Sequence, residues 1–400
     1  MSTLALNIIV GKGEAELLGR CLGSFHAPEV FDEIVVVNTS DDEEIDSVAS
    51  ELKLTIARFQ WISEDFPEGN FGGARNCAVD NTKSDYIMWL DSDDLLNPKY
   101  FEQWKKLVET VKDDKNNKIE LFTMPYALIC DTNGDPVSAF TRERIFKRTA
   151  ARWRNPVHEL ILPIDTESWK TELTANFNGV SIVHAPIKPQ YTSAVRNIKI
   201  LEHEYFVKKV DDIHIKFFLA RDYLIAGRIK ESEELFNDII DKMETSYDML
   251  YAIAIEMVWY YAYGKYHPRP QLKELNIKNE KQLEKWLRIA LAFSAKSAEP
   301  FVLLGDLYFI RDNFTQAERL YMLAMSRGKD VPKVQNLLFY KEIPLWRLSM
   351  LYYHTKEYEK SLCTIKKWIP VSSNPEQGLH IRKEVFAVLG QEYGYLKEVA

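Results

Sequence analysis

The first 130 or so residues alternate short apolar runs with segments whose apolar positions recur at helical spacing. Strands are predicted for residues 4–10, 32–38, 54–59, 85–90 and 119–129. Several of these runs are apolar throughout, as expected of parallel strands whose sheet is covered on both faces. Helical spacing is found at 14–25, 42–52, 73–82 and 98–111. The alternation predicts an α/β domain with an open, mostly parallel sheet flanked by helices.

Three further strand-like pieces follow a turn at residues 131–136. They are "RERIFKR" at 142–148, "PVHELIL" at 156–162 and "GVSIVHA" at 179–185. Their position after the βα alternation predicts an antiparallel extension of the sheet that ends near residue 190.

From about residue 195 onward the pattern becomes helical, with almost no strand signal. Residues 217–240, 301–325 and 344–368 share one layout, in which an apolar helix, a short polar turn and an amphipathic helix follow one another. We therefore predict two domains, an α/β domain at 1–192 and an all-α domain at 193–400.

The helical half also shows an internal repeat. Leu307 aligns with Leu351, and Ala317 with Ser361, at a spacing of 44 residues. Residues 258–266 could supply a further unit in the gap before this pair. Such helix pairs bury their apolar faces by stacking on one another, which predicts a solenoid of tetratricopeptide-like (TPR-like) hairpins.

Composition narrows the class of protein. The chain has 400 residues, 46% of them hydrophobic and 28% charged, with a formal net charge of -8. These values are typical of a globular protein, and the acidic balance argues against a protein that mainly binds a nucleic-acid backbone. No apolar span reaches roughly 18 residues, and the first residues lack a signal-peptide pattern. We expect a cytoplasmic protein that does not contact a membrane.

Four cysteines are spread along the sequence without a CxxC pair. They are Cys21, Cys77, Cys130 and Cys363. This spacing indicates neither a zinc knuckle nor a disulfide framework, and reduced thiols are the simplest interpretation.

The segment "DYIMWLDSDD" at 85–94 drives an apolar strand into three aspartates. In an open α/β sheet, ligands bind beyond the carboxyl ends of the strands, which is where Asp91 and Asp93 would lie. Their oxygens suit Mg²⁺ or Mn²⁺, the ions that accompany diphosphates. The alternative is that Asp93, Asp94 and Asn97 only cap a helix that begins at Pro98.

A second candidate is "GNFGGARN" at 69–76. Its paired glycines permit close backbone approach, the start of the helix could face an anion, and Arg75 could contact phosphate oxygens. The alternative is a plain loop-to-helix transition with a solvated arginine. Gly11, Gly13 and Gly19 fit neither a dinucleotide fingerprint nor a P-loop.

Two histidines and a glutamate form the third candidate. His158 and Glu159 stand at the start of one strand-like piece, and His184 stands at the end of another. An imidazole can complete a carboxylate site for Mn²⁺, and a glutamate near a reacting hydroxyl or thiol can act as a general base. Ordinary hydrogen-bonded histidines remain the alternative.

Taken in order, "DEIVVVNTSDD", "DFPEGNFGGARN", "YIMWLDSDD", "RIFKR", "WRNPVHE" and "VSIVH" resemble the family 2 glycosyltransferases of the GT-A fold, a Rossmann-like fold of nucleotide-diphospho-sugar transferases. The later motifs, followed by helical hairpins, are similar to the subgroup that contains the peptide S-glycosyltransferases of bacteriocins. The resemblance covers about residues 4–190 by motif, and 200–400 only by architecture.

This resemblance implies an inverting transfer of a sugar from a nucleotide donor, usually a uridine diphosphate (UDP) sugar, with Mn²⁺ or Mg²⁺. It implies metal ligands Asp93, Asp91 and His184, with Asp93 the most direct. The donor-binding positions that it implies are Val10, Gly11, Asn38, Asp65, Arg75, Asp91 and Ser92. Glu159 is the candidate base, and the neighbouring His158 is the other catalytic candidate.

Two departures from the family pattern concern recognition of the base. The family usually has an aspartate after the second strand, where this chain has Asn38, and the first strand lacks the common Pro-x-Asn sequence. An amide can both donate to and accept from a pyrimidine edge, so base binding can survive with an altered preference.

Several alternatives stay open at this stage. The chain could be a non-catalytic scaffold with a degenerate GT-A domain and a partner-binding solenoid, or a nucleotidyltransferase of related fold. The acceptor could be a peptide or protein, a cell-wall polymer, a glycan or a modified DNA base. The helical domain could also form a homodimer.

Overall fold

The computed structural model describes residues 1–60, 63–65, 68–113, 118–130, 134, 136–166, 168–185, 190–243, 245–263, 276–327, 335–372, 379–380, 382–385 and 387. The chain forms two compact units. The first contains Met1–Cys130 and Ala139–Phe236, and the second contains Asp131–Ser138 and Asn237–Ala400. The predicted domain boundary between residues 192 and 193 falls within the first helix after the sheet and stays a prediction.

The strands are β1 (Leu4–Val10), β2 (Glu33–Asn38), β3 (Thr55–Arg58), β4 (Tyr86–Asp91), β5 (Asp94–Leu96), β6 (Leu121–Cys130), β7 (Pro136–Lys147), β8 (Ala151–Arg154), β9 (Leu160–Pro163), β10 (Thr174–Asn176), β11 (Ile182–His184) and β12 (Gln335–Asn336). The helices of the first unit are α1 (Ala15–Ser24), α2 (Ala27–Val30), α3 (Glu43–Glu51), α4 (Phe71–Asp80), α5 (Phe101–Lys112), α6 (Gln190–Glu202) and α7 (Ile213–Ile225), and α8 (Ile229–Lys242) leads into the second.

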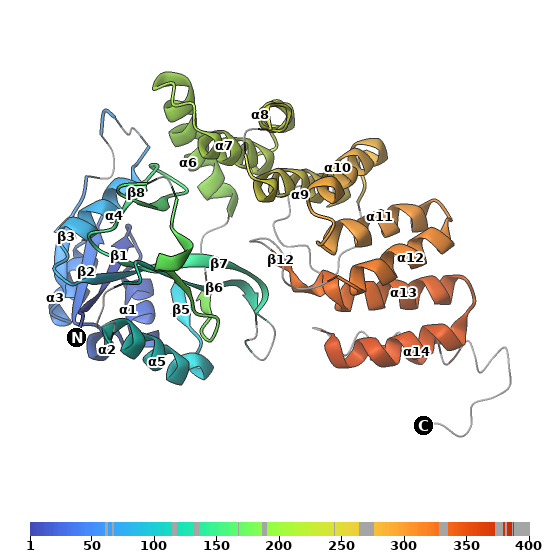
Figure 1. Cartoon of the computed structure of the whole chain (residues 1–400), viewed down its shortest axis with the longest axis horizontal. Helices are drawn as coiled ribbons and strands as arrows, with labels where there is room; N and C mark the ends of the chain where they lie inside the picture. Colours follow the sequence, from blue (N-terminus) through green and yellow to red (C-terminus); the bar gives the residue numbers. More distant parts are fainter. Residues whose placement is uncertain are drawn as a thin grey trace. The chain divides into compact units, whose positions relative to one another are not determined.

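The main sheet has the order β3-β2-β1-β4-β7-β6-β11-β5, and β10 pairs with β6 (Figure 1). The first four strands in this order are parallel, and β7 joins β4 in antiparallel register. All five predicted strands of the βα alternation are confirmed. The predicted antiparallel extension is correct for β7, whereas β11 runs parallel to β6 and antiparallel to β5.

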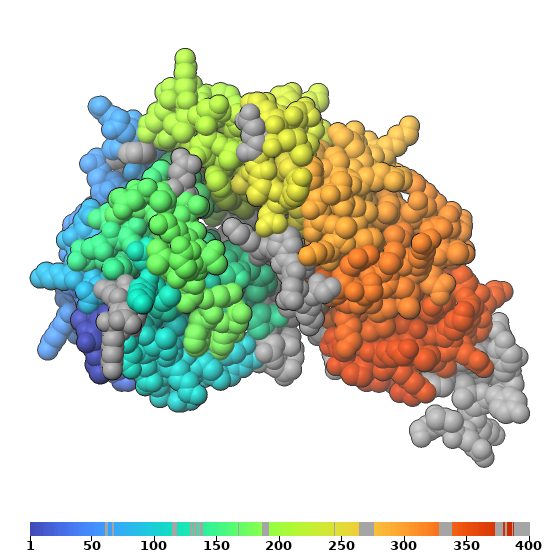
Figure 2. Space-filling view, viewed as in Figure 1, coloured from blue at the N-terminus to red at the C-terminus, as the bar shows by residue number. Residues whose placement is uncertain are grey.

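Helices cover both faces of the parallel strands. Successive β1 side chains point to opposite faces of the sheet, so both sets of side chains are buried beneath helices. Leu4, Leu6 and Ile8 pack with α1 and α5, while Ile9 packs with α4 on the other face. Side chains fill the space between the ribbons of this unit, coloured from blue to green in Figure 2. The buried strands therefore read as continuous apolar runs, as the sequence pattern indicated.

The strand register brings the predicted donor positions to one edge. Val10 lies beside Asn38 at the ends of β1 and β2, and Ile9 lies beside Asp91 at the end of β4. This is the carboxyl edge, where ligands of open α/β sheets bind.

One predicted strand is shorter than expected. Residues 155–158 form a bend, and β9 begins only at Leu160, where it pairs with β8 in a separate two-stranded sheet. His158 has a φ of +52° and Asn155 a φ of +66°. Non-glycine residues in this region do not continue a strand, so His158 and Glu159 lie in a turn.

The second unit is built of paired helices. They are α9 (Tyr247–Tyr263), α10 (Glu280–Phe293), α11 (Glu299–Ile310), α12 (Phe314–Met325), α13 (Glu342–His354) and α14 (Tyr358–Trp368). α9 packs with α10, α11 with α12, and α13 with α14, and each pair contacts the next. The predicted pairs at 301–325 and 344–368 are confirmed as α11 with α12 and α13 with α14. The predicted pair at 217–240 corresponds to α7 and α8, and α7 lies in the first unit. α9 occupies part of the predicted gap unit at 258–266, the rest of which lies outside the described residues.

Small residues let the paired helices approach closely. A Cβ on Gly305 would lie 2.6 Å from the ring of Tyr321 in the partner helix. In the next pair Ser349 stands at the position equivalent to Gly305, and its carbonyl accepts at 2.8 Å from the hydroxyl of Ser361, which is equivalent to Ala317. The predicted repeat therefore corresponds to a repeated helix crossing. Among the described helices, none combines the length and apolarity needed to cross a membrane.

Candidate active site

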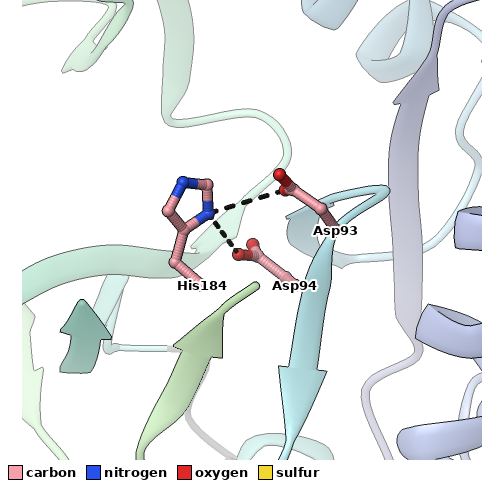
Figure 3. Close-up of side chains that lie close together, drawn as sticks. All are labelled: Asp93, Asp94 and His184. Carbon is pink, nitrogen blue, oxygen red and sulfur yellow. Dashed lines mark ion pairs between the residues drawn. The ribbon is translucent and has the colours of Figure 1, made fainter. Parts of the chain in front are cut away.

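Three potential metal ligands gather where β4, β5 and β11 meet. The His184 Nδ1 atom lies 3.6 Å from the Asp93 Oδ1 atom and 3.8 Å from the Asp94 Oδ1 atom (Figure 3). Their candidate ligand atoms all lie within 4.8 Å of one another. The antiparallel pairing of β11 with β5 places His184 directly beside Asp94, although the two residues are far apart in the sequence.

The cluster fits a divalent cation. His184 Nδ1 is buried and has no hydrogen-bond partner among the described residues. Burial alone would lower its pKa, but Asp93 and Asp94 raise the pKa of His184 to about 9. A cation bound at about 2.1 Å holds adjacent ligand atoms about 3 Å apart, so a small contraction would close the cluster around an ion.

Asp94 is already held by protein groups. Its Oδ1 accepts from the Tyr126 hydroxyl at 2.7 Å, and its Oδ2 pairs with the Arg144 Nη1 atom at 2.9 Å and accepts from the Asp91 amide at 3.0 Å. Asp93 and His184 therefore offer the more available ligand atoms. Asp94 does not cap the following helix, which is capped by Asn97 instead.

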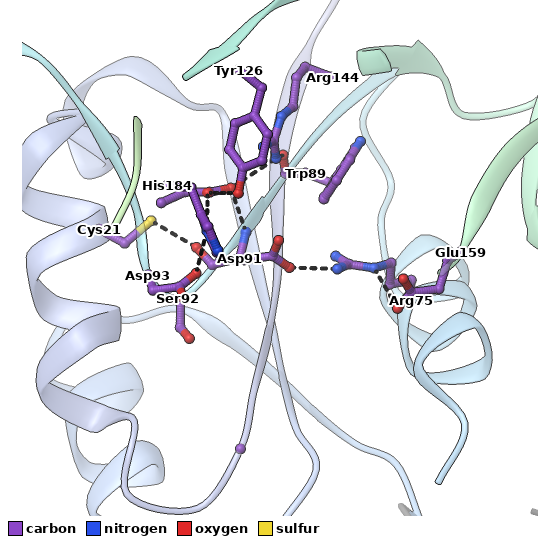
Figure 4. Close-up of polar contacts among 12 residues, drawn as sticks. Cys21, Arg75, Trp89, Asp91, Ser92, Asp93, Tyr126, Arg144, Glu159 and His184 are labelled. Carbon is purple, nitrogen blue, oxygen red and sulfur yellow. Dashed lines mark hydrogen bonds and ion pairs between the residues drawn. The ribbon is translucent and has the colours of Figure 1, made fainter. Parts of the chain in front are cut away.

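A buried arginine connects two predicted site carboxylates. The Arg75 Nη2 atom lies 2.5 Å from the Asp91 Oδ1 atom, and the Arg75 Nε atom lies 3.4 Å from the Glu159 Oε1 atom (Figure 4). The guanidinium lies between the rings of Trp89 and Trp153, 4.5 and 4.8 Å from their centroids. Burial opposes the charged form of Asp91, but Arg75 and then Arg144 hold the pKa of Asp91 well below its usual range.

The segment before Glu159 docks on the start of α4. A Cβ on Gly72 would lie 2.2 Å from the Asn155 carbonyl oxygen, so only glycine fits this contact. The Phe71 amide donates to the Pro156 carbonyl at 2.7 Å, and the Gly73 amide donates to the Asn70 side chain at 2.8 Å. The paired glycines thus serve chain packing, and these two amides are already bonded within the protein.

The loop after β1 is tied to the aspartate segment through Glu14. The Glu14 Oε2 atom accepts from the Gly11 amide at 3.0 Å and from the Ser92 hydroxyl at 2.9 Å. The Val10 carbonyl accepts from the Thr39 amide and hydroxyl. Of the predicted donor positions, Gly11 and Ser92 are therefore joined through Glu14, while Val10 is bonded to Thr39 after β2.

Asn38 is buried and fully hydrogen-bonded. Its amide nitrogen donates to the Asp42 carbonyl and the Asp46 carboxylate, and its oxygen accepts from the Ser40 amide and hydroxyl. These four bonds use the whole capacity of the amide. The predicted contact with a nucleotide base would require some of them to be exchanged, and it stays a prediction. Asp65, the remaining predicted donor position, is exposed.

His158 is directed differently from its neighbour Glu159. The His158 Nε2 atom lies 2.9 Å from the Asp222 Oδ2 atom, and its Nδ1 atom lies 3.3 Å from the Arg221 Nη2 atom. Burial lowers the pKa of His158 despite the proximity of Asp222. The two catalytic candidates thus belong to different contacts, Glu159 with Arg75 and His158 with α7.

Sequence reasoning gave no site role to Asp94, Glu14 or Arg144. Arg144 is fully buried on β7 and stacks 4.1 Å from the Trp89 ring centroid. The segment "RERIFKR" is mostly charged, so its pattern did not show that Arg144 would be buried and would need a charged partner. Glu14 lay in a loop whose partner across 78 residues could not be read from local spacing.

Comparisons with known proteins agree with this geometry in the first unit. Residues 8–159 match the profile of the family described as "Glycosyl transferase family 2". No protein of curated function matches the sequence.

Three solved structures illustrate the range of structural likeness. Glucosyl-3-phosphoglycerate synthase from Mycobacterium tuberculosis, in complex with Mn²⁺ and uridine-diphosphate-glucose, is 14% identical at a TM-score of 0.34, covering 53% of this chain and 80% of that chain. S. aureus TarS 1–349 is 13% identical at 0.31, covering 94% and 92%. YrrB, a TPR protein with an unusual peptide-binding site, is 12% identical at 0.34, covering 48% and 84%. Because these TM-scores lie below 0.5, the likenesses add no evidence about function.

Proposed function

Because residues 8–159 match the profile of glycosyl transferase family 2, we propose that the chain transfers a sugar from a nucleoside-diphosphate donor to a hydroxyl or thiol acceptor. The donor that the family resemblance implies is a UDP-sugar, with Mn²⁺ or Mg²⁺ as cofactor. The proposed reaction inverts the configuration at the anomeric carbon.

The observation that carries this proposal is the Asp93, Asp94 and His184 cluster at the ligand-binding edge of the sheet. Asp93 and His184 would hold the cation directly, while Asp94 is kept in place by Tyr126 and Arg144. When bound, the cation supplies positive charge against the departing diphosphate. The buried His184 Nδ1 atom faces two carboxylates without a hydrogen bond among the described residues, an arrangement in which a cation could take the place of the imidazole proton.

The other residues would orient the donor and activate the acceptor. Asp91 stays ionised beside Arg75 and can accept hydrogen bonds from sugar or ribose hydroxyls. Glu159, largely buried, would accept the acceptor proton as the new glycosidic bond forms and the bond to the diphosphate breaks. A single displacement without a covalent enzyme intermediate gives inversion.

The second unit would bind the acceptor, because stacked helix pairs present extended surfaces to partners. The acceptor stays open among a peptide or protein, a cell-wall polymer, a glycan and a modified DNA base. Cytoplasmic location and a homodimer through the helical unit also remain proposals.

Calorimetry with UDP, with and without Mn²⁺, tests the proposal. We expect metal-dependent binding that weakens at least tenfold in Asp93→Ala. The control is Asp80→Ala, which removes an exposed carboxylate paired with Arg152 at the other end of α4. Binding that ignores the metal, or that is equal in both variants, would favour the scaffold alternative.

A mass-spectrometric screen of nucleotide sugars then identifies the donor. Slow metal-dependent transfer to water should release a nucleoside diphosphate from one of the donors tested. Release of pyrophosphate instead would indicate a nucleotidyltransferase and overturn the proposed reaction.

A further inference from the structure

His158 is held on three sides by residues of α6 and α7. Its Nε2 atom lies 2.9 Å from the Asp222 carboxylate and 3.3 Å from the Asn197 Nδ2 atom, and its Nδ1 atom lies 3.3 Å from the Arg221 guanidinium. Its ring stacks on Phe218 with centroids 4.2 Å apart and planes 12° apart. Both ring nitrogens are thus engaged by the protein.

These contacts fix the tautomer. A carboxylate can only accept and a guanidinium can only donate, so the two contacts together place the proton on Nε2 and leave Nδ1 as the acceptor. The Asn197 Nδ2 atom, which is also a donor, then packs beside Nε2 without a hydrogen bond to it. A general base needs an acceptor nitrogen that faces the substrate. The acceptor nitrogen of His158 faces Arg221, so this ring is poorly placed to take a proton from a substrate.

The backbone at His158 needs such support. Its φ of +52° lies in the left-handed region, where a non-glycine residue costs about 1 kcal/mol or more. Glu159 follows directly, and its carboxylate reaches Arg75 in the site. The direction in which the Glu159 side chain projects from the backbone therefore depends on how His158 is held.

We infer that His158 and Asp222 are positioning residues that orient Glu159 for the transfer reaction. This inference rests on the proposed function. It also assigns a role to α7, which lies outside the segment matched by the family profile. In the proposed reaction α7 would belong to the catalytic apparatus, although it is a helix from the region of the chain that resembles a solenoid.

Replacement of His158 separates positioning from base catalysis. Glutamine can place its amide N–H where Nε2–H lies, but it cannot take up a proton. We expect His158→Gln to keep at least a third of the wild-type kcat, and His158→Ala to lose at least tenfold, with the KM for the donor within twofold in both. If folded His158→Gln is as inactive as His158→Ala, the inference is wrong.

Variants of Asp222 test the inference in a second way, with a control residue on the same helix. Asp222→Ala should lower kcat at least tenfold and leave metal-dependent UDP binding within twofold. Asp212→Ala removes the N-cap of α7, where the carboxylate accepts from the His214 and Ile215 amides, without touching His158. It should reduce stability but not kcat. Equal losses of kcat in both variants would mean that Asp222 acts only through stability and would overturn the inference.

Hydrogen exchange of the full-length protein tests, without relying on activity, whether Asp222 anchors the turn at His158. Amides of residues 157–162 should exchange at least tenfold faster in Asp222→Ala than in the wild type or in Asp212→Ala. Unchanged exchange would contradict the anchoring itself. If the wild type is inactive but shows the expected exchange pattern, the proposed reaction is refuted, whereas the anchoring of the turn by Asp222 is supported.

Discussion

Arg75 is the residue on which the two carboxylates of the site depend. It is buried between two tryptophan rings and pairs with Asp91 and Glu159 at once. In Arg75→Ala, two carboxylates would lose their cation in a region of low dielectric. We expect the free energy of unfolding to fall by about 3–5 kcal/mol in urea titrations.

An exposed arginine serves as the control for this loss. Arg58 pairs with Asp46 on the surface, with a side chain 58% exposed, and Arg58→Ala should cost less than about 1 kcal/mol. Lysine at position 75 should not restore stability, because its single ammonium cannot bridge two carboxylates in the way a guanidinium does. A loss at Arg75 no larger than that at Arg58 would contradict the bridging role.

His184 gives the metal-free protein a distinct pH dependence. Its pKa rises to about 9 from the ordinary value of 6.5, despite burial, because Asp93 and Asp94 favour the protonated ring. Its contribution to stability is therefore fully present below pH 6.5 and is lost as the pH rises through 9. Urea unfolding with a chelator present should show this decline in the wild type, and His184→Gln should remove it.

A metal ion would compete with that proton. A ligating imidazole must be neutral, so Mn²⁺ binding near pH 7.5 should release close to one proton from the wild type. Calorimetry in buffers of different ionisation enthalpy measures this number. His184→Gln should release almost none, and equal release from both proteins would remove His184 from the ligand set.

The contact between α4 and the turn before β9 depends on one glycine. A Cβ at Gly72 would collide with the backbone of Asn155, so Gly72→Ala must displace the turn that carries Glu159. We expect a loss of about 1–3 kcal/mol in thermal or urea unfolding, together with lower activity.

Gly19, in the interior of α1, is the matched control. Nothing lies within 4 Å of a Cβ added there, so Gly19→Ala should stabilise the protein by up to about 1 kcal/mol. A neutral Gly72→Ala would show that the docked turn adapts without cost.

The sequence predicted elements well where their pattern was local. Strand β4 and the aspartates that follow it combine an apolar run with a sharp polar end, and both features are visible within ten residues. Residues 156–158 of the turn were predicted to belong to a strand because they precede the apolar residues of "PVHELIL". Contacts from Gly72 and Asp222, both distant in sequence, impose its positive φ values instead. Local pattern carries no information about such tertiary constraints.

Asn38 illustrates the same limit in the site. The family pattern placed this residue opposite a nucleotide base, but its amide closes the turn before α3 through Ser40 and Asp46. Which hydrogen bonds an amide makes depends on groups brought close by the fold. Several positions implied by the resemblance lie at one edge of the sheet, but the bonds formed there required the structure.

The division into two compact units makes a prediction for the molecule as a whole. The Asp93 and His184 cluster lies in the first unit, while the paired helices from α9 onward form the second with a separate set of buried residues. If the units unfold separately, scanning calorimetry should resolve two transitions. UDP with Mn²⁺ should raise the transition temperature of the first unit only.

The size of that shift follows from binding linkage. At a ligand concentration one hundred times Kd, the first unit should gain about 2.7 kcal/mol, and Asp93→Ala should abolish the gain. The buried Asp306 carboxylate, which accepts a hydrogen bond from the Tyr321 hydroxyl, lies in the second unit. Asp306→Ala should therefore lower the temperature of the second unit's transition and leave that of the first unit unchanged. A single transition that shifts as a whole in both experiments would mean that the two units fold as one cooperative body. In that case the helices would contribute directly to the stability of the site, because any loss of their packing would unfold it too.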